Sequence, residues 1–556
     1  MKIALISMEV VPGRPDQNAA AMREKIAAAK AAHAEIAVFP ALSLSGLFLG
    51  GVWKHSAFLR DCASYAEEIA AAAQDITVVF GNAAKEEGAC AGVSRTLMEA
   101  RNGVLREVAR RPLHGAGTSF DPLFYTAADR NFILAADATP FPHCFGARTL
   151  AKTAREKHMP IFYINTLGLQ DKGKTVYAFS GSAQVFNAAG ERVLISPAYA
   201  EGLTIIDTTQ LSPAAARPAE AAIAPIHRTI RYAVQKFLAR IHMERVVIGI
   251  SGGIDSAVAA ALYVDAIGAD KVLLVNMPSK FNSATTKDLA AQLAESLGCR
   301  HMIVPIEESV AYTAEQLTGI PIMGKPAAEG EHLTISSFVR ENMQARDRSG
   351  RVLSAVAAAW GAGFTCNANK AESTVGYATL YGDQAGFLSA LADLWKYQIY
   401  DLARYLNETV YGREVIPQGI IDIVPSAELS DAQNVDEGKG DPIRYPYHDY
   451  LFRAFVEENR IPEDILAHYA DGDLEDDIGC GKGGVIASFF STTKDFIDDL
   501  ERWWNLYTGM AVAKRIQAPP LISVTGRAYG ADHPESQIGP YETISYRALK
   551  EKLLRK

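Results

Sequence analysis

One stretch decides the fold of the second half of the chain: VVIGISGGIDSAVAA, residues 246–260. Its first five residues are apolar and mostly β-branched, which predicts a buried strand. Two glycines then permit a tight turn, and the alanine-rich residues beyond them favour a helix. A strand, a glycine turn and a helix in this order bring backbone amides and a helix N-terminus together, as an anion such as phosphate requires.

The turn itself, residues 251–256, indicates an ATP site, because its amides and hydroxyls suit a polyphosphate. Asp255 cannot attract phosphate, so we assign it to a bridging divalent cation, and its hard oxygen ligands favour Mg²⁺. Serine and aspartate acting as ordinary helix caps are the alternative interpretation. The residues of the turn expected at ATP are Ser251, Gly252, Gly253, Asp255 and Ser256.

Around this stretch the sequence predicts a chain of two α/β domains. A length of 556 residues exceeds one ordinary domain. The Ala/Pro-rich segment LSPAAARP, residues 211–218, marks a boundary. We therefore expect a first domain over residues 1–210, a linker over 211–225 and a second domain over 226–556. In the second domain, strands at 245–250 and 272–276 flanking a helix predict a doubly wound parallel sheet.

Composition narrows the class of protein further. The chain is 49% hydrophobic and 21% charged, which is typical of folded globular proteins. A net charge of -9 argues against a nucleic-acid surface, and no apolar run reaches membrane-spanning length. The six cysteines lack C-x-x-C spacing and no signal peptide is recognisable, so we expect reduced thiols and a cytoplasmic protein.

The 251–256 turn differs from the Walker loop and resembles that of the PP-loop ATP pyrophosphatases, which cleave ATP to AMP and pyrophosphate. Downstream motifs extend the resemblance to NAD synthetases over residues 226–530. These motifs are ENMQARDR (341–348), NANKAE (367–372) and STVGYATLYGD (373–383). The resemblance implies that Arg346 binds deamido-NAD and that Glu372 holds magnesium together with Asp255. A surface arginine and a first-turn glutamate are the plain alternatives.

Three further residues gain a role only from this resemblance, since a lone lysine is usually a surface residue. Lys396 in LWKY matches an ATP-contacting lysine, Ser426 in VPSAEL an ATP-site hydroxyl, and Lys514 the substrate-binding K-R. Asn367 stands where the family usually has a threonine that meets the adenylate. An amide can still donate and accept there, so Asn367 stays in the expected ATP site.

The N-terminal segment AVFPALSLSG, residues 37–46, resembles the nitrilase superfamily and implies a shortened αββα sandwich. In glutamine-dependent NAD synthetases such a domain hydrolyses glutamine with a Glu-Lys-Cys triad. Here Ala41 replaces the glutamate, Arg110 and Arg111 stand where the lysine is expected, and the C-E-D nucleophile segment is missing. Cys144 lies beyond that point, and we interpret it as a structural thiol.

The expectation is therefore an ATP- and Mg²⁺-dependent ligase that amidates deamido-NAD through an acyl-adenylate, with free ammonia as nitrogen donor and a pseudo-glutaminase domain. By analogy it forms a homo-oligomer. The charged loops after Leu429 and at residues 471–483 are candidate covers for the site. Three alternatives remain: amidation of another carboxylate, a glutamine-dependent enzyme with a non-standard nucleophile, and a nucleotide sensor.

Overall fold

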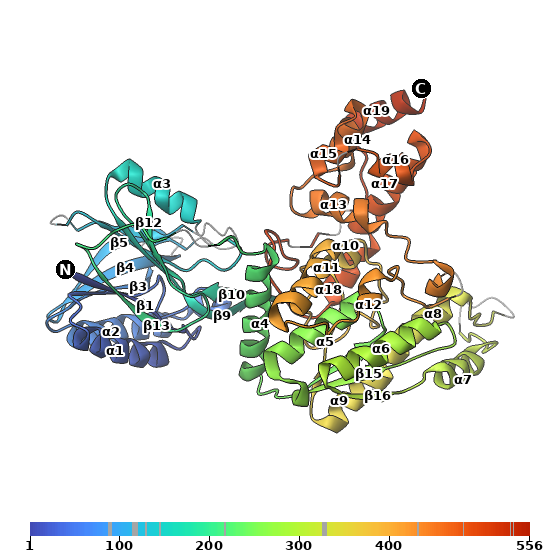
Figure 1. Ribbon diagram of the computed structural model, residues 1–556, viewed down its shortest axis with the longest axis horizontal. Helices are drawn as coiled ribbons and strands as arrows, with labels where there is room; N and C mark the ends of the chain where they lie inside the picture. The colour runs from blue at the N-terminus through green and yellow to red at the C-terminus, as the bar shows by residue number, and fades with distance from the viewer. Residues whose placement is uncertain are drawn as a thin grey trace. The chain divides into compact units, whose positions relative to one another are not determined.

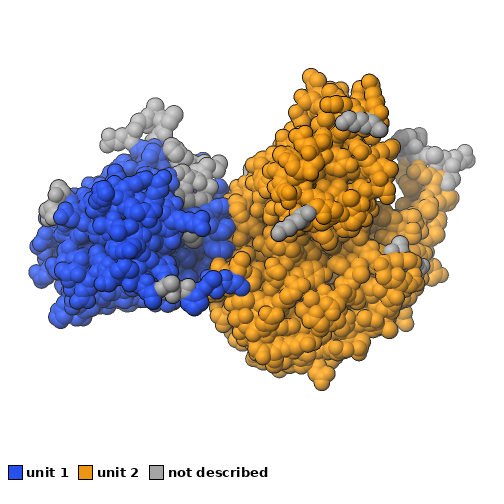
Figure 2. All heavy atoms as spheres, turned by 45° about the horizontal axis from the view of Figure 1, so that its top comes forward, with its two compact units in different colours: residues 1–221 blue, residues 222–556 orange. Residues whose placement is uncertain are grey.

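The computed structural model describes residues 1–86, 92–113, 121–127, 130–143, 146–215, 218–324, 331–430, 433–481, 483–533, 535–536 and 539–555. The chain divides into two compact units, Met1–Ala221 and Ala222–Lys556, which Figure 2 distinguishes by colour. The point of division falls inside the expected linker, residues 211–225. Each unit has hydrophobic clusters of its own.

The first unit contains two stacked sheets with helices outside them (Figure 1). The strand order is β13-β1-β2-β3-β4-β5 in one sheet and β12-β11-β8-β7-β6 in the other. The elements are β1 (Lys2–Ser7), α1 (Pro15–Ala31), β2 (Ile36–Val38), α2 (Ser56–Ala72), β3 (Thr77–Lys85), β4 (Val93–Arg101), β5 (Val104–Pro112), β6 (Leu123–Tyr125), β7 (Ile133–Asp137), α3 (Ala147–Lys157), β8 (Ile161–Asn165), β9 (Leu167–Lys172), β10 (Thr175–Ser180), β11 (Ala183–Phe186), β12 (Arg192–Ile195) and β13 (Gly202–Asp207).

Side-chain alternation explains the layers of this unit. In β1, Ile3 and Leu5 join the cluster between the two sheets, whereas Ala4 and Ile6 pack in the cluster with α1 and α2. In β7 and β8, every second residue packs against α3 instead. Successive residues of a strand point to opposite faces, so each sheet buries both of its faces. The result is the αββα sandwich that the sequence predicts.

The second unit is built on a four-stranded parallel sheet with the order β16-β15-β14-β17. Its elements are α4 (Ile223–Arg240), β14 (Val246–Ile250), α5 (Ile254–Ile267), β15 (Val272–Asn276), α6 (Ala284–Leu297), β16 (Arg300–Ile303), α7 (Glu307–Leu317), α8 (Ser337–Arg346), α9 (Ser354–Trp360), β17 (Gly363–Phe364), α10 (Lys370–Val375), α11 (Lys396–Tyr405), α12 (Gln418–Asp422), α13 (Tyr445–Val456), α14 (Pro462–Asp471), α15 (Leu474–Ile478), α16 (Val485–Phe489), α17 (Thr493–Thr508), α18 (Met510–Gln517), β18 (Leu521–Ile522) and α19 (Ile544–Leu554).

Helices cover both faces of this sheet. Val247 and Val275 pack with residues of α7 and α9 on one face. Helix α5 packs on the other face, against β14 and β15, and itself contacts α4 and α11. Strands buried on both faces are apolar throughout, as in the VVIGI stretch. The doubly wound parallel sheet predicted from the sequence is therefore confirmed.

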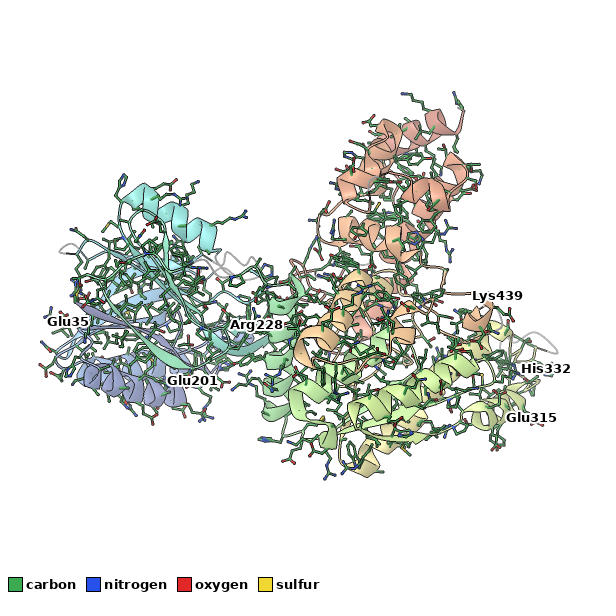
Figure 3. The ribbon with its side chains drawn as sticks, viewed as in Figure 1. Glu35, Glu201, Arg228, Glu315, His332 and Lys439 are labelled. Carbon is green, nitrogen blue, oxygen red and sulfur yellow. The ribbon has the colours of Figure 1, made fainter. Side chains whose placement is uncertain are left out.

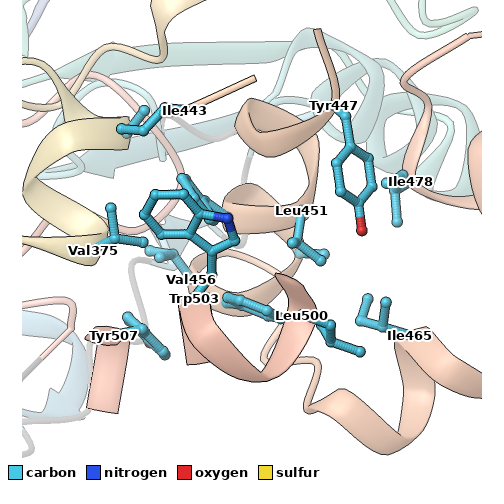
Figure 4. Packing of buried hydrophobic residues seen from close by; sticks show 14 of the residues in the cluster. Val375, Ile443, Tyr447, Leu451, Val456, Ile465, Ile478, Leu500, Trp503 and Tyr507 are labelled. Atoms are coloured by element: carbon cyan, nitrogen blue, oxygen red, sulfur yellow. The ribbon is translucent and has the colours of Figure 1, made fainter. Parts of the chain in front are cut away.

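A helical layer follows the sheet in the chain. Figure 4 shows its core, in which Trp503 and Leu500 of α17 pack with Leu451 of α13, beside Val375 at the end of α10. This core gives α10 and α13 a rigid support, and both helices carry residues of the candidate site. Within the described part of the chain, we find no helix that combines the length and hydropathy needed to span a membrane.

Candidate functional site

The topology of the parallel sheet fixes where a site can form. The chain continues from β14 to β15 and β16 on one side, and β17 pairs with β14 on the other, placing Val246 opposite Gly363. The strand order therefore reverses at β14. Ligands of such sheets bind at the carboxyl ends of the strands where the order reverses. The segments that leave β14 and β17 meet there.

The turn after β14 is held tightly. Gly252 has φ +88°, and a Cβ on this residue would lie 2.2 Å from the carbonyl oxygen of Thr286 in α6. The Ser256 hydroxyl accepts from the backbone amide of Ser251 at 3.2 Å and donates to the Gly253 carbonyl at 3.0 Å. The two serines therefore shape the turn, and Gly253 precedes the first residue of the 14-residue helix α5. This leaves the N-terminus of α5 as an anion site.

A cavity of about 250 Å³ opens beside this turn. A second cavity, of about 160 Å³, shares several of its lining residues, including Ser251, Asp255 and Glu372. The first extends over the ends of β14, β15 and β17, and both apolar and polar residues line it. The second extends toward Lys396 and Ser426. The turn therefore lies between two adjoining cavities.

Two carboxylates, a lysine and an asparagine meet at this point. The Lys396 ammonium lies 2.6 Å from Asp255 Oδ2 and 3.6 Å from Glu372 Oε1. Asn369 Nδ2 donates to Asp255 Oδ1 at 2.9 Å and to Glu372 Oε1 at 2.8 Å. Tyr445 donates to the same Glu372 oxygen at 3.2 Å, and its ring lies 4.8 Å from the Lys396 nitrogen. The structure thus brings together all three residues expected to carry catalysis.

The electrostatics of this group follow from burial and like charge. The pKa of Glu372 is raised to about 8, chiefly by burial, with Lys396 opposing the shift and the nearby carboxylates of Asp255 and Asp441 adding to it. Burial disfavours the charge on Lys396, but Asp255 and Glu372 outweigh it and raise the Lys396 pKa above its usual range. Three carboxyl groups, those of Asp255, Glu372 and Asp441, thus share one buried lysine, and a cation bound beside them would favour the ionised form of Glu372.

Mg²⁺ is the cation that the sequence predicts here. The described residues contain no group of three or more histidine, cysteine or acidic side chains arranged to hold a metal. Mg²⁺ bound with a nucleotide needs only one or two carboxylates, because phosphates and water supply its other ligands. Glu372 Oε2 accepts no hydrogen bond from the described residues, so it is available as a ligand. The Asp255–Glu372 pair therefore fits Mg²⁺ held jointly with ATP.

The segment that follows α12 closes one side of the second cavity. Glu428 is 3% exposed, and its carboxylate accepts from the Ser283 amide at 3.1 Å and the Thr286 hydroxyl at 2.7 Å, both at the start of α6. Asp441 accepts from the Ala427 amide at 3.0 Å. We call residues 424–430 the strap. Its central residues, Ala427 and Glu428, are therefore fastened to Asp441 and to the start of α6.

The two loops expected as covers differ in their placement. Val435 and Asp441, beyond Leu429, line the second cavity. Lys439 lies at the exposed outer edge of this loop, where it pairs with Glu437 at 2.5 Å, and Figure 3 labels it. In the other loop, Leu474 and Ile478 pack into the helical core, and none of its described residues, 471–481 and 483, lines either cavity.

The residues expected at substrate and ATP occupy different surroundings. Arg346 is exposed, donates to the Leu380 carbonyl at 3.1 Å and lies outside the lining of both cavities. Arg348 does line the first cavity, and burial lowers its pKa to about 10. Lys514 donates to the carbonyls of Gly376 and Ala378, which turns its ammonium toward the end of α10. Their substrate contacts stay a prediction.

Asn367 and Ser426 both line a cavity. Asn367 donates from Nδ2 to the Gly249 carbonyl at 3.0 Å and accepts from the Thr365 hydroxyl at 2.8 Å. Its amide therefore ties the end of β17 to β14. Ser426 donates to the Gln433 carbonyl at 2.6 Å, which stabilises the strap.

Sequence reasoning missed three residues that organise the site: Asn369, Glu428 and Tyr445. The first two lie within the quoted motifs NANKAE and VPSAEL, where the resemblance assigned roles only to their neighbours. Tyr445 begins α13, 73 residues after Glu372, and no local pattern connects the two.

The first unit has the strands of the expected sandwich, but it lacks the glutamate and the lysine of a working glutaminase at the expected positions. Ala41 is fully buried after β2, and its amide donates to the Asp137 carbonyl at 3.2 Å. Arg110 and Arg111 lie on β5, paired with surface carboxylates at 2.6 and 3.3 Å. Strand β6, which pairs with β7, has only three residues, Leu-Phe-Tyr, and so it does not carry the C-E-D nucleophile segment. Cys144 lies outside the described residues.

A second thiol of this unit lies within the described residues. Cys62 of α2 is fully buried, and burial raises its pKa to about 12. A thiol that stays protonated at neutral pH is a poor nucleophile. Cys62 therefore does not replace the missing catalytic cysteine.

Comparison with known proteins agrees with this geometry. Residues 226–474 match the family model described as NAD synthase. A glutamine-dependent NAD(+) synthetase of Xylella fastidiosa (strain 9a5c) is 29% identical, over 96% of this chain and 97% of its own length.

Two solved structures share the fold along nearly the whole chain. A glutamine-dependent NAD(+) synthetase from Cytophaga hutchinsonii has a TM-score of 0.72 at 15% identity and covers 100% of this chain and 99% of its own. One from Acinetobacter baumannii, in complex with ADP, has a TM-score of 0.64 at 23% identity and covers 97% and 98%. Residues 226–474 therefore resemble NAD synthases in sequence, and the chain as a whole shares its fold with the two solved synthetases.

Proposed function

We propose that this chain is an NAD synthetase that amidates deamido-NAD with ATP, releasing AMP and pyrophosphate. The observation that carries the proposal is the meeting of the 251–256 turn with Asp255, Glu372 and Lys396 where the strand order reverses, inside the domain that matches the family. The turn and the N-terminus of α5 bind the phosphates. The first cavity, with Arg348 and Asn367 in its lining, receives the nucleoside.

The carboxylate of deamido-NAD attacks the α-phosphorus of ATP, and pyrophosphate leaves. Ammonia then attacks the resulting acyl-adenylate, and AMP leaves as NAD forms. Asp255 and Glu372 hold Mg²⁺, which when bound neutralises charge on the phosphates. Lys396, which is bound mainly to Asp255, contacts ATP. The strap keeps water from the acyl-adenylate. Arg346 and Lys514 bind deamido-NAD outside the two cavities.

We propose ammonia as the nitrogen donor, although the relatives are named as glutamine-dependent enzymes. Support comes from the first unit. Ala41 cannot act as a base, and an arginine at position 110 or 111 stays protonated and cannot transfer a proton. Losing a covalent nucleophile typically lowers the rate on the order of 10⁶-fold. A glutaminase that lacks all three groups does not supply ammonia at a useful rate, so this unit serves assembly or regulation.

A nitrogen-donor assay tests the proposal. We expect NAD formation from deamido-NAD, ATP and ammonium, with release of pyrophosphate, and no formation above background with glutamine. Formation from glutamine at a rate near that with ammonium would refute the ammonia proposal, and Cys144→Ala and Cys90→Ala would then identify the thiol. Pyrophosphate release with only another carboxylic acid would instead make the chain a different amide ligase. No release with any acid would leave a nucleotide sensor.

A further inference from the structure

We infer that Asn369 is a positioning residue that fixes the distance between the Asp255 and Glu372 carboxylates. The inference rests on the proposed function, in which these two side chains hold the metal. Asn369 lies directly before α10 and is fully buried. Its Nδ2 group carries two hydrogens, and its two acceptors lie at nearly equal distances, Asp255 Oδ1 at 2.9 Å and Glu372 Oε1 at 2.8 Å.

Lys396 and Tyr445 also contact these carboxylates, but neither of them connects the two as evenly as Asn369 does. Lys396 lies 2.6 Å from Asp255 but 3.6 Å from Glu372, so it is bound mainly to Asp255. Tyr445 reaches Glu372 alone. Once both carboxyl groups are ionised, as metal binding requires, their charges repel each other, and a neutral donor that bonds to both keeps them close without altering the net charge. Asn369 therefore presets the spacing at which both carboxylates reach one cation.

Asn369 has a second role that must be separated from the first. Its Oδ1 accepts from the Glu372 amide at 3.0 Å, which caps the N-terminus of α10. Serine and aspartate cap helices as well as asparagine does, but neither can donate two hydrogen bonds to two carboxylates. Asn369→Ser and Asn369→Asp therefore preserve the cap and remove the bridge. Aspartate also places a third negative charge between the first two.

The experiment compares these variants in the full-length chain. We expect kcat with ammonium to fall about 10²-fold in Asn369→Ser and further in Asn369→Asp, because a displacement of about 1 Å at reacting groups costs this much. The KM for deamido-NAD should stay within about threefold, since that substrate is bound elsewhere. Asn407→Ser is the matched control. Asn407 bonds to the backbone of Val415 and Ile416, outside the site, so this variant should lower Tm and spare kcat.

If both Asn369 variants keep the wild-type kcat, Asn369 is only a helix cap and the inference fails. Crystal structures of the wild type and Asn369→Ser separate this failure from failure of the proposed function. Whatever reaction the protein catalyses, we expect the two carboxylates to move apart by about 1 Å in the variant. Unchanged carboxylates would overturn the positioning role. A wild type that forms no NAD would overturn only the proposed function.

Discussion

Asp137 shows how a single buried carboxyl group can make the stability of the chain depend on pH. It lies at the end of β7, fully buried, and accepts from the Ala138 amide at 2.7 Å, the Thr139 hydroxyl at 2.6 Å and the Tyr163 hydroxyl at 2.7 Å. Burial raises its pKa to about 6, and the three hydrogen bonds only partly oppose this. The native chain therefore holds a proton on Asp137 over a range of pH in which the unfolded chain does not.

This difference gives the stability a defined dependence on pH. Between about pH 4 and pH 6 the native state binds one proton more than the unfolded state, so the free energy of unfolding falls as pH rises, by roughly 3 kcal/mol at most. Asp137→Asn should remove this loss, so that the variant gains stability relative to wild type between pH 4.5 and 7.5. Denaturant unfolding of both proteins at the two pH values measures the difference.

The control for this prediction is Asp207→Asn. Asp207 is half-buried, and hydrogen bonds from Thr209 lower its pKa below the ordinary value, so it is already ionised at pH 4.5. Its substitution should shift both unfolding curves equally. An Asp137→Asn chain with the same pH dependence as wild type would contradict the prediction.

At the scale of single residues, the sequence predicted which residues form the site better than it predicted which of them contact one another. Glu372 and Lys396 were found because each lies in a recognisable motif. The bridge from Asn369 to Asp255 spans 114 residues and depends on how α5 and α10 approach each other. Such a contact is a product of tertiary packing, and no local pattern encodes it.

The glycine turn provides an element-scale prediction with a built-in control. Gly252→Ala would place a Cβ 2.2 Å from the Thr286 carbonyl at φ +88°, so α6 must shift. Gly253 has φ -93°, and a Cβ there meets only the Ser251 hydroxyl, at 3.3 Å. We expect Gly252→Ala to lower stability by about 2 kcal/mol or more and to abolish ATP-dependent pyrophosphate release, whereas Gly253→Ala folds normally. Thermal unfolding and pyrophosphate assays distinguish them. Equal loss of stability in both variants would contradict this account.

The strap provides a second prediction at the scale of an element. Glu428→Ala leaves the Ser283 amide and the Thr286 hydroxyl without their shared acceptor, which should lower the free energy of unfolding by about 1–3 kcal/mol. Because Thr286 also supports the glycine turn, we expect the KM for ATP to rise more than that for deamido-NAD. Glu437→Ala is the matched control, since Glu437 is exposed and pairs with Lys439. Initial-rate kinetics measure both constants, and an unchanged KM for ATP in Glu428→Ala would show that the strap does not act on the nucleotide.

Local elements were the part of the fold that sequence predicted most fully. The VVIGI strand and the helix after it occupy β14 and α5, because apolar runs and alanine-rich segments determine structure over short distances. The two candidate covers could not be told apart, since both are charged loops. Only packing shows that Leu474 and Ile478 anchor one of them in the helical core.

At the scale of the whole molecule, the two units differ in the kind of residue that they have kept. The second keeps its turn, both carboxylates and Lys396 at one point, as synthesis of an amide requires. The first keeps its two buried sheets but has Ala41 where a base is needed. Under the proposed function, the first unit therefore keeps its fold without its reaction, because packing and chemistry depend on different residues.

This division predicts how the intact chain responds to a reactive glutamine analogue. A diazo-ketone analogue of glutamine alkylates the catalytic cysteine of a working glutaminase. Here we expect no added mass on peptides containing Cys62, Cys90 or Cys144 and no loss of ammonium-dependent NAD formation, because alanine at position 41 and arginine at positions 110 and 111 cannot activate a thiol. Mass spectrometry after treatment measures the first and the rate assay the second. The control is a glutamine-dependent relative treated in parallel, which must be labelled. A single stoichiometric adduct on this chain would restore the glutaminase and make the N-terminal unit an enzyme with a displaced nucleophile.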